Sequence, residues 1–393
     1  MRKRAFDEAG GLARVPVGHS GCAMETSWLR SLAVLLVVGA PIVGQQESDP
    51  AQRARQLVRR IELPGEARAA IRELVELGPA ALPPLHEALR DPRPEVVQWA
   101  LFATTGLAGD IESLREPLRL LMAHKDLGVA LAASRAFVAL EGKGRTLLAD
   151  YPKNSVVEFD AADQPKVRDN LPFAMSVMPL AVGHLLVSVH GAHRVVELDG
   201  DGAEIWSFGD LNSPSDAERL PNGNTLIADS GQLRVVEVDG AGNVVWTFAG
   251  DIRPIDVDRL GNGNTLICSY NRSGVVEVDP QGKIVWQLPG GNVRDADRFP
   301  DGTTLVTLTD ERRVVLVDAA HKELQQWKIG FGANDAELLP DGHLLVSGEG
   351  RAVELDGNGK EVWRQALGYG GRVTRCGRRI APKVAADEAD KKR

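Results

Sequence analysis

A β-branched run that closes on an aspartate recurs along the chain, and five copies are each followed seven to nine residues later by a tryptophan. The repeat length is about 40 residues, which is typical of a β-propeller blade made of four short strands. A further copy at 156–160 lacks the tryptophan. The full copies cover 195–199, 235–239, 275–279, 314–318 and 352–356, and the tryptophans are Trp206, Trp246, Trp286, Trp327 and Trp363.

The clearest unit spans residues 215–248 and predicts strands at 216–220, 225–229, 234–239 and 244–248. Asn222-Gly223 lies between the first two strands and predicts a two-residue hairpin turn with positive φ at both positions. The later copies have Asn-Gly or Asp-Gly at 262–263, 301–302 and 341–342. Between the third and fourth strands, Asp239 would start a turn through its side chain and Gly242 would take the left-handed position.

The two ends of the repeat region complete each other. Residues 146–150 resemble the second strand of a blade, but no inner strand precedes them. Residues 372–376 align with the inner strand at 295–299 and have no blade of their own. We therefore expect a six-bladed propeller, residues 144–380, closed by pairing of the C-terminal strand with the first blade, which removes the open sheet edges.

Residues 45–143 have a different character, with leucine and alanine recurring at helical spacing. Pro84, Val96 and Ala100 are matched 33 residues later by Pro117, Val129 and Ala133. The stretch 77–109 resembles HEAT-type repeats, which implies a short α-solenoid of helical hairpins with a surface for a protein partner. The alternative is that this segment docks on the propeller as a spacer or cap. The predicted fold class is therefore multidomain, α plus all-β.

The N-terminal segment predicts export. Residues 29–44 contain an apolar stretch suited to a secretory signal, so 1–44 is interpreted as a signal peptide, with Met24 as an alternative start. A retained signal anchor is the competing interpretation, and only that would bring the protein to a membrane. The expected location is periplasmic or extracellular, and residues 381–393 are expected to form a disordered charged tail. The net charge of −8 argues against nucleic acid as a partner.

The stretch 219–246, RLPNGNTLIADSGQLRVVEVDGAGNVVW, resembles secreted bacterial β-propellers of the NHL and PQQ-like repeat class. The resemblance covers residues 145 to about 378 and implies the propeller scaffold. Quinoprotein dehydrogenases of the broader class have eight blades, adjacent cysteines and calcium with a quinone. This chain has six units and no Cys-Cys pair, so no cofactor is predicted, although Ca²⁺ remains open.

Candidate ligand-binding residues fall on the channel and on the loops that join the second and third strands. Four aspartates start inner strands at equivalent positions, and Ala174 and Arg372 are expected at the two remaining ones. Carboxylates around a channel suit Ca²⁺, but residues that recur in register also serve the repeat's own hydrogen bonds. The loops at 190–193, 231–234, 271–274 and 310–313 differ between copies, as functional loops do. The candidates are Asp216, Asp256, Asp295, Asp335, Arg372, His190, His193 and Tyr270, with the four aspartates as the metal ligands if a metal binds.

These features favour an exported, non-enzymatic binding or scaffold protein that uses the propeller's loop face and the helical segment to bind a protein or a carbohydrate-like ligand. The alternative is a calcium-dependent hydrolase or lactonase with a cation in the central channel. The chain has no HExxH, no GxSxG and no Walker-type phosphate loop.

Overall fold

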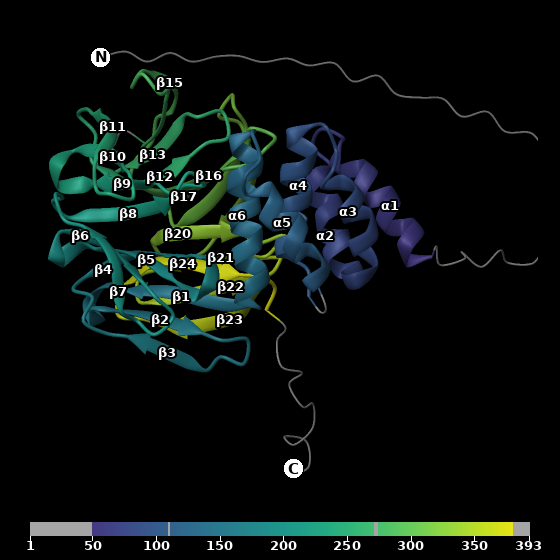
Figure 1. Cartoon of the computed structure of the whole chain (residues 1–393), viewed down its shortest axis with the longest axis horizontal. Coiled ribbons are helices and arrows are strands. Elements are labelled where there is room, and N and C mark those ends of the chain that lie inside the picture. Colours follow the sequence, from purple (N-terminus) through teal and green to yellow (C-terminus); the bar gives the residue numbers. More distant parts are fainter. Residues whose placement is uncertain (1–48, 109–110, 271–273, 380–393) are drawn as a thin grey trace, which may run out of the picture. The chain divides into compact units, whose positions relative to one another are not determined.

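The computed structural model describes residues 49–108, 111–270 and 274–379. The predicted signal peptide, the loop residues 271–273 and the predicted tail lie outside these ranges. The described part of the chain consists of helices up to residue 142, followed by six sheets (Figure 1). Among the described residues, no helix is both long enough and apolar enough to cross a membrane.

The N-terminal segment is helical, as its leucine and alanine spacing predicts. Asp49 starts the first helix by accepting the backbone N–H of Ala51, and Asp126 caps the last one on Val129. Short 3-10 turns precede two of the shorter helices. The helices are α1 (Pro50–Ile61), α2 (Ala67–Leu77), α3 (Leu82–Ala88), α4 (Pro94–Thr105), α5 (Arg115–Leu121) and α6 (Leu127–Gly142).

Six antiparallel sheets of four strands follow, each one a blade. Blades 2 to 6 use consecutive strands, whereas blade 1 is completed by the C-terminal strand. The strands, blade by blade, are β24 (Gly370–Cys376), β1 (Arg145–Asp150), β2 (Ser155–Phe159) and β3 (Pro165–Arg168); β4 (Ala174–Pro179), β5 (Leu185–Val189), β6 (Arg194–Leu198) and β7 (Glu204–Phe208); β8 (Pro214–Arg219), β9 (Thr225–Asp229), β10 (Arg234–Val238) and β11 (Val244–Ala249); β12 (Pro254–Arg259), β13 (Thr265–Ser269), β14 (Gly274–Val278) and β15 (Ile284–Leu288); β16 (Val293–Arg298), β17 (Thr304–Leu308), β18 (Arg313–Val317) and β19 (Glu323–Lys328); β20 (Ala333–Leu338), β21 (Leu344–Gly348), β22 (Arg351–Leu355) and β23 (Glu361–Ala366).

The predicted closure of the ring is confirmed. The C-terminal strand β24 pairs antiparallel with β1, with Val373 opposite Leu148 and Thr374 opposite Leu147. Both Val373 and Leu148 are buried. The inner strand of blade 1 is therefore supplied from more than 200 residues away in the sequence. The sheet order β24-β1-β2-β3 also gives six blades, as the repeat count predicts.

The turns between first and second strands differ from the prediction. Gly223 has a φ of 87°, but Asn222 is not among the residues with positive φ, so the turn is not the expected two-residue type. The asparagine side chain instead accepts the backbone N–H of Asn224 at 3.0 Å. This local hydrogen bond stabilises an ordinary φ at the asparagine and leaves only the glycine left-handed. The turn at Asp239 is as predicted, since its Oδ1 accepts two backbone N–H groups and Gly242 has a φ of 85°.

Neighbouring blades are joined by a recurring set of arginine, glutamate and tryptophan. The arginine ends the inner strand of one blade, pairs with a glutamate of the preceding blade and lies over that blade's tryptophan. The sets are Arg219 with Glu197 and Trp206, Arg259 with Glu237 and Trp246, Arg298 with Glu277 and Trp286, and Arg375 with Glu354 and Trp363. A cation over an indole face contributes about 0.5–2 kcal/mol, more when water is excluded.

The tryptophans of the repeat differ in burial. Trp327 and Trp363 are buried, but Trp206, Trp246 and Trp286 are half-buried. These rings lie on the outermost strand of each blade, where a neighbour covers only part of the ring. Trp246 and Trp286 use their exposed edge to donate to a backbone carbonyl in the next blade, at Pro280 and Ala319.

The helical segment packs against the propeller face that carries the glycine-containing turns. Trp99 of α4 stacks on Phe299 of blade 5 with ring centroids 6.0 Å apart, and Arg68 of α2 pairs with Asp301 at 3.0 Å. A side chain at Gly261 would lie 2.7 Å from the Cα of Gly128 in α6, so this approach requires a glycine. One hydrophobic cluster extends from the helices into blades 5 and 6. Much of the helical surface is therefore used for contact within the chain.

Candidate functional site

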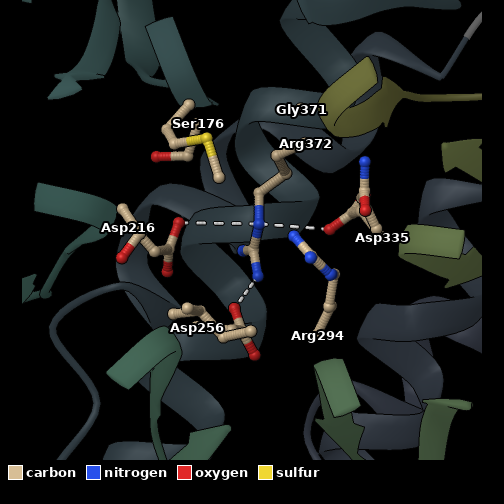
Figure 2. A pocket seen from close by; sticks show the side chains of 11 residues that line it. Ser176, Asp216, Asp256, Arg294, Asp335, Gly371 and Arg372 are labelled. Carbon is tan, nitrogen blue, oxygen red and sulfur yellow. Dashed lines mark hydrogen bonds and ion pairs between the residues drawn. The ribbon is translucent and has the colours of Figure 1, made fainter. Parts of the chain in front are cut away.

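The inner strands place one ring of side chains in the central channel. Asp216, Asp256, Asp295 and Asp335 come from β8, β12, β16 and β20, and Arg372 comes from β24. Figure 2 shows Arg372 among Asp216, Asp256 and Asp335. The structure thus brings together five of the predicted site residues. The sixth position was predicted wrongly. Ser176 pairs with Ser188 as Asp216 pairs with Ala228, so Ser176 takes the sixth position, whereas Ala174 corresponds to Pro214.

The guanidinium of Arg372 is ion-paired with all four aspartates. Its Nε lies 3.2 Å from Asp335 Oδ1 and 3.5 Å from Asp216 Oδ1, and its Nη2 lies 3.2 Å from Asp295 Oδ1. Nη2 also contacts Asp256 Oδ1. The four carboxylates are nearly buried, while the arginine side chain keeps about a quarter of its surface exposed. Arg372 therefore occupies the position at which a channel cation would sit.

Each aspartate also holds the next blade through its second oxygen. Asp295 Oδ2 accepts the backbone N–H of Ala336 at 3.0 Å, and Asp335 Oδ2 accepts that of Val373 at 2.9 Å. Asp216 and Asp256 make the same contact with Val257 and Ala296. The recurrence of aspartate therefore serves the hydrogen bonding of the repeat, and a hydrogen bond between charged and neutral groups contributes about 1.5–3 kcal/mol.

A second acidic ring lies two residues further along the same strands. It consists of Glu218, Asp258, Asp297 and Glu337. Arg135 reaches it from α6, with Nη2 3.2 Å from Glu218 and 3.1 Å from Asp258. The sequence reasoning missed this ring, although residues two apart on a strand share a face and the signal was present. Arg135 could not be found in this way, because it belongs to a helix outside the repeat.

Two arginines face eight carboxyl groups in this channel, and burial raises the pKa of most of them. Burial raises the pKa of Asp256 and Asp295 well above the ordinary value, against the opposing effect of Arg372 on both. In the second ring, burial raises the pKa of Asp297 to about 7 and that of Glu337 to about 7. The channel therefore takes up protons near neutral pH, which lowers the repulsion between its carboxylates.

This proton uptake predicts an unusual pH dependence. Because the folded pKa of Asp297 is about 7, above its ordinary value of 3.8, the folded state binds more protons than the unfolded state between these values. Stability from this group is present at low pH and is lost as the pH rises towards 7. We expect the melting temperature of Asp297→Asn to fall less than that of the wild type between pH 5 and 8. Each unit of pKa shift corresponds to roughly 1.4 kcal/mol of pH-dependent stability, which the variant lacks at this position.

Thermal melts of the wild type and Asp297→Asn across this pH range check the prediction. Asp201→Asn, on the exposed turn between β6 and β7, is the matched control and should follow the wild type. Parallel curves for all three proteins would contradict proton uptake by the channel.

A small cavity lies where the channel opens on the loop face. Its volume is about 30 Å³, which holds one or two water molecules but no substrate-sized molecule. Ser176 Oγ is buried there without a hydrogen-bond partner among the described residues. The lining residues are Met175, Ser176, Ser215, Asp216, Ile255, Asp256, Arg294, Asn334, Asp335, Gly371 and Arg372 (Figure 2).

Aromatic and arginine side chains surround this opening. Arg294 lies over the ring of Tyr270 at 5.0 Å, and Arg253 lies over the same ring at 5.5 Å. The Nε of Arg294 is buried and has no hydrogen-bond partner in the described part of the chain. Tyr369 donates its hydroxyl to Asn334, another residue of the cavity wall, at 3.2 Å. This set of contacts places the predicted Tyr270, which is 43% exposed, at the edge of the opening.

The opening continues into a cluster of aromatic rings on blades 1 and 2. Tyr151 lies 6.2 Å from Tyr369, 4.9 Å from Phe173 and 5.9 Å from His190, between ring centroids. Phe173 is 43% exposed. We call Tyr151, Phe173, Tyr270, Arg294 and Tyr369 the loop-face rim. The sequence reasoning found only Tyr270 among them. Tyr151, Phe173 and Tyr369 lie in connections whose meeting depends on the closed ring, and Arg294 lies on β16.

The two predicted histidines lie beside the rim and not in the channel. His190 is half-buried, and burial lowers the pKa of its imidazole. His193 is exposed, and its Nδ1 accepts the backbone N–H of Ser213 at 3.0 Å. Neither residue lines the channel cavity, so the structure does not bring them together with the aspartates.

The propeller matches a known repeat family. Residues 152–327 match the family model described as outer membrane protein assembly factor BamB, of the PQQ-like type. The match covers blades 1 to 5 in whole or in part, which is less than half of the chain. A comparison with curated proteins found no match.

Three solved structures illustrate what this chain is similar to. A protein of unknown function from Bacteroides caccae is 19% identical, with a TM-score of 0.52, over 59% of this chain and 98% of that chain. A virginiamycin B lyase from Staphylococcus aureus is 11% identical, with a TM-score of 0.44, over 57% and 81%. A nidogen/laminin complex contributes a chain that is 12% identical, with a TM-score of 0.49, over 59% and 98%. At this identity, the similarity to the Bacteroides protein concerns the fold alone.

Proposed function

We propose that this chain is an exported, non-enzymatic binding protein that holds a protein partner on the loop-face rim of its propeller. The observation that carries the proposal is the combination of a channel filled by Arg372 with an adjoining rim, in which Phe173 and Tyr270 are exposed and the other rim residues are half-buried. Tyrosine and arginine are enriched among the residues that dominate protein interfaces. The rim offers both types on a rigid scaffold.

The arrangement of the rim supports a partner with carboxylate or backbone carbonyl groups. The guanidinium of Arg294 is held in place by Tyr270 on one side and the cavity wall on the other. A held guanidinium binds such groups with less loss of side-chain freedom than a mobile one. The exposed ring of Phe173 and the tyrosines would contact the apolar parts of the same partner.

Export is part of the proposal and rests on the apolar segment at 29–44. The description of the matching family model, an outer membrane assembly factor, agrees with a role in the cell envelope. The helical segment is proposed to contribute through the faces that do not pack on the propeller. A carbohydrate-like ligand is the alternative occupant of the rim.

A calcium-dependent hydrolase remains the second candidate function, because eight carboxyl groups line the channel. For such an enzyme, Arg372 would have to leave its four ion pairs before a cation could enter. Its guanidinium already places a positive charge among the four aspartates. The ion pairs therefore favour the binding protein.

Capture from the exported protein fraction, with quantitative mass spectrometry, tests the proposal. The bait is the purified protein, compared with the Phe173→Ala/Tyr270→Ala variant and with Val245→Ala, whose side chain is 53% exposed on the outer strand of blade 3. We expect a protein that the wild type and Val245→Ala enrich equally and that the rim variant loses by about tenfold or more, as for interface residues worth over 1.4 kcal/mol.

The outcomes separate the alternatives. Enrichment that does not depend on the rim residues would reject the loop face as the binding surface. A polysaccharide, and no protein, lost with the rim variant would replace the protein partner by a carbohydrate. Both measurements use variants with exposed side chains, so that folding should be preserved.

A further inference from the structure

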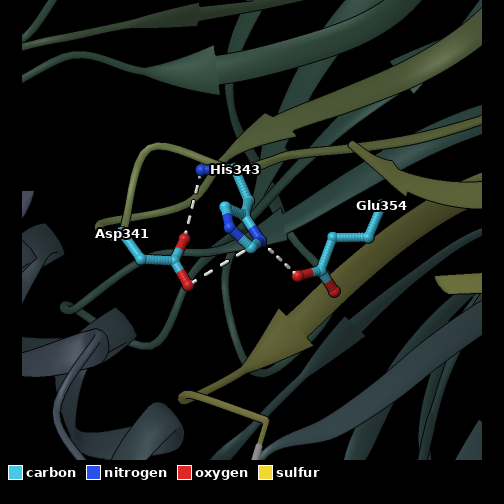
Figure 3. A group of neighbouring side chains, drawn as sticks. All are labelled: Asp341, His343 and Glu354. Carbon is cyan, nitrogen blue, oxygen red and sulfur yellow. Dashed lines mark hydrogen bonds and ion pairs between the residues drawn. The ribbon is translucent and has the colours of Figure 1, made fainter. Parts of the chain in front are cut away.

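We infer that blade 6 contains a zinc site formed by Asp341, His343 and Glu354, separate from the channel and from the loop-face rim. Asp341 and His343 lie in the turn between β20 and β21, and Glu354 lies on β22 (Figure 3). One ligand atom from each residue lies within 4.8 Å of the others. Imidazole nitrogen and carboxylate oxygen are the donors that Zn²⁺ takes besides thiolate, and three protein ligands leave a fourth position for water.

The two carboxylates each have one oxygen fixed and the other directed at the imidazole. Asp341 Oδ1 accepts the backbone N–H of His343 at 3.1 Å, and its Oδ2 lies 4.0 Å from His343 Nδ1. Glu354 Oε2 pairs with Arg375 at 2.9 Å, and its Oε1 lies 2.7 Å from the same Nδ1. Hydrogen bonds of this kind orient ligands and raise metal affinity.

The distances require little movement. Ligand atoms at about 2.1 Å from zinc in a tetrahedral site are about 3.4 Å apart, from the zinc–ligand lengths of such sites. The observed separations of 2.7 and 4.0 Å lie on either side of that value. A small rotation of His343 and Asp341 would equalise them. The side chains are 10–29% exposed, so that an ion can enter while water is largely excluded.

The chain itself supplies copies of this arrangement that lack the ligands. In blade 4, Asn262 and Asn264 occupy the positions of Asp341 and His343, and Asn264 donates its side-chain amide to Glu277 at 2.6 Å. Blade 3 has Asn222, Asn224 and Glu237 in the same contacts. The amide NH₂ groups satisfy the glutamate without a metal. In blade 6, a carboxylate (Asp341) and an imidazole (His343) stand at the positions of the two amides, and the glutamate is again present as Glu354.

Blade 2 is a partial copy and a useful control. His184 Nδ1 lies 2.9 Å from Glu197 Oε1, as in blade 6. Val182 stands where Asp341 stands, so that only two of the three ligands are present. If a histidine–glutamate pair were sufficient for binding, blade 2 would bind zinc equally well. The third ligand therefore distinguishes blade 6 among the described blades.

Bound zinc would connect the turn between β20 and β21 to β22. Both belong to blade 6, which lies next to blade 1, where β24 closes the ring. The two carboxylates would balance the charge of the dication. The turn also packs against α2, since a side chain at Gly342 would lie 3.1 Å from the Arg72 Nε. Occupancy would therefore stabilise the folded chain where the helical segment meets the propeller.

Isothermal titration of the full chain with Zn²⁺ alone tests the inference. The key variant, Asp341→Asn/His343→Asn, recreates the residues of blades 3 and 4, and His184→Asn in blade 2 is the matched control. We expect one zinc per chain in the wild type and in His184→Asn, and affinity at least about 100-fold lower in the double variant, since even the loss of orienting residues costs 10- to 100-fold.

Two further readouts keep the test decisive. A Co²⁺-loaded wild type should show the visible absorption of a four-coordinate site, which the double variant should lack, and Ca²⁺ should not compete for it. Asp341→Asn alone provides the comparison if the double variant has a lower melting temperature without metal. Zinc affinity and stoichiometry that are unchanged in the double variant, or absent in the wild type, would overturn the site.

Discussion

Truncation of the chain after Gly368 is expected to abolish cooperative unfolding of the propeller. The deletion removes β24, so β1 loses its partner and blade 1 is left with an open inner edge. It also removes Arg372 from among four buried carboxylates and Arg375 from its contacts with Glu354 and Trp363. The net stability of an ordinary folded protein is only roughly 5–15 kcal/mol, so the loss of a whole inner strand with these contacts is large in comparison.

Calorimetry and limited proteolysis measure this effect. The matched control ends after Arg379, which keeps β24 and the contacts of Arg379 with Asp163 and Trp363. It should melt like the full chain. A protein truncated after Gly368 that melts cooperatively at the temperature of the parent would refute closure of the ring by the C-terminal strand.

Replacement of Arg372 by methionine is expected to give the largest effect of any point substitution in the channel. Methionine preserves much of the side-chain length but removes the charge that pairs with four aspartates. Removal of one partner from a buried ion pair typically costs about 3–5 kcal/mol, because the remaining charge is left uncompensated. Chemical denaturation of the wild type and Arg372→Met measures the difference.

Arg119→Met is the matched control for Arg372→Met. Arg119 pairs with Glu116 on the surface of α5, where both side chains are about 60% exposed. Solvent screens an exposed ion pair of this kind, so the control should differ little from the wild type. Equal and small losses for both substitutions would show that the channel cluster does not hold the ring together.

Sequence reasoning was strongest where the repeat itself carries the information. The strand positions, the number of blades and the pairing of 372–376 with blade 1 followed from matching one copy against another. The residue Asp239 and the glycine at 242 also behave as their turn chemistry predicts. These features depend on local patterns and on a repeat length, both of which are visible in the printed sequence.

It was weaker where the outcome depends on contacts between distant parts of the chain. Ala174 was placed in the ring by an alignment error of two residues, since the repeat length of about 40 residues leads from Asp216 to Ser176, which pairs with Ser188 as Asp216 pairs with Ala228. The loop-face rim combines Tyr151 with Tyr369, whose meeting requires the closed ring. Arg135 enters the channel from a helix, and the packing of α4 on Phe299 depends on tertiary contacts.

Arg372 would compete with a metal ion for the four predicted ligands, Asp216, Asp256, Asp295 and Asp335. The sequence placed this arginine in the same ring, but its side-chain position decides which cation the aspartates meet. The arginine reaches all four carboxylates, and the raised pKa of Asp256 and Asp295 lowers the negative charge that remains, so the ring does not require a resident metal. The claim that Arg372 is the cation of the channel underlies the proposal of a binding protein over a hydrolase.

A calcium titration followed by melting temperature tests this claim most directly, with the Asp341→Asn/His343→Asn substitutions present throughout so that blade 6 does not contribute. The protein with Arg372 is expected to show no shift with Ca²⁺, whereas the additional Arg372→Met substitution should make stability rise with Ca²⁺, because the carboxylates then lack a cation. A calcium-dependent rise in the protein that retains Arg372, lost on Asp256→Asn, would contradict the account and favour the calcium-dependent hydrolase.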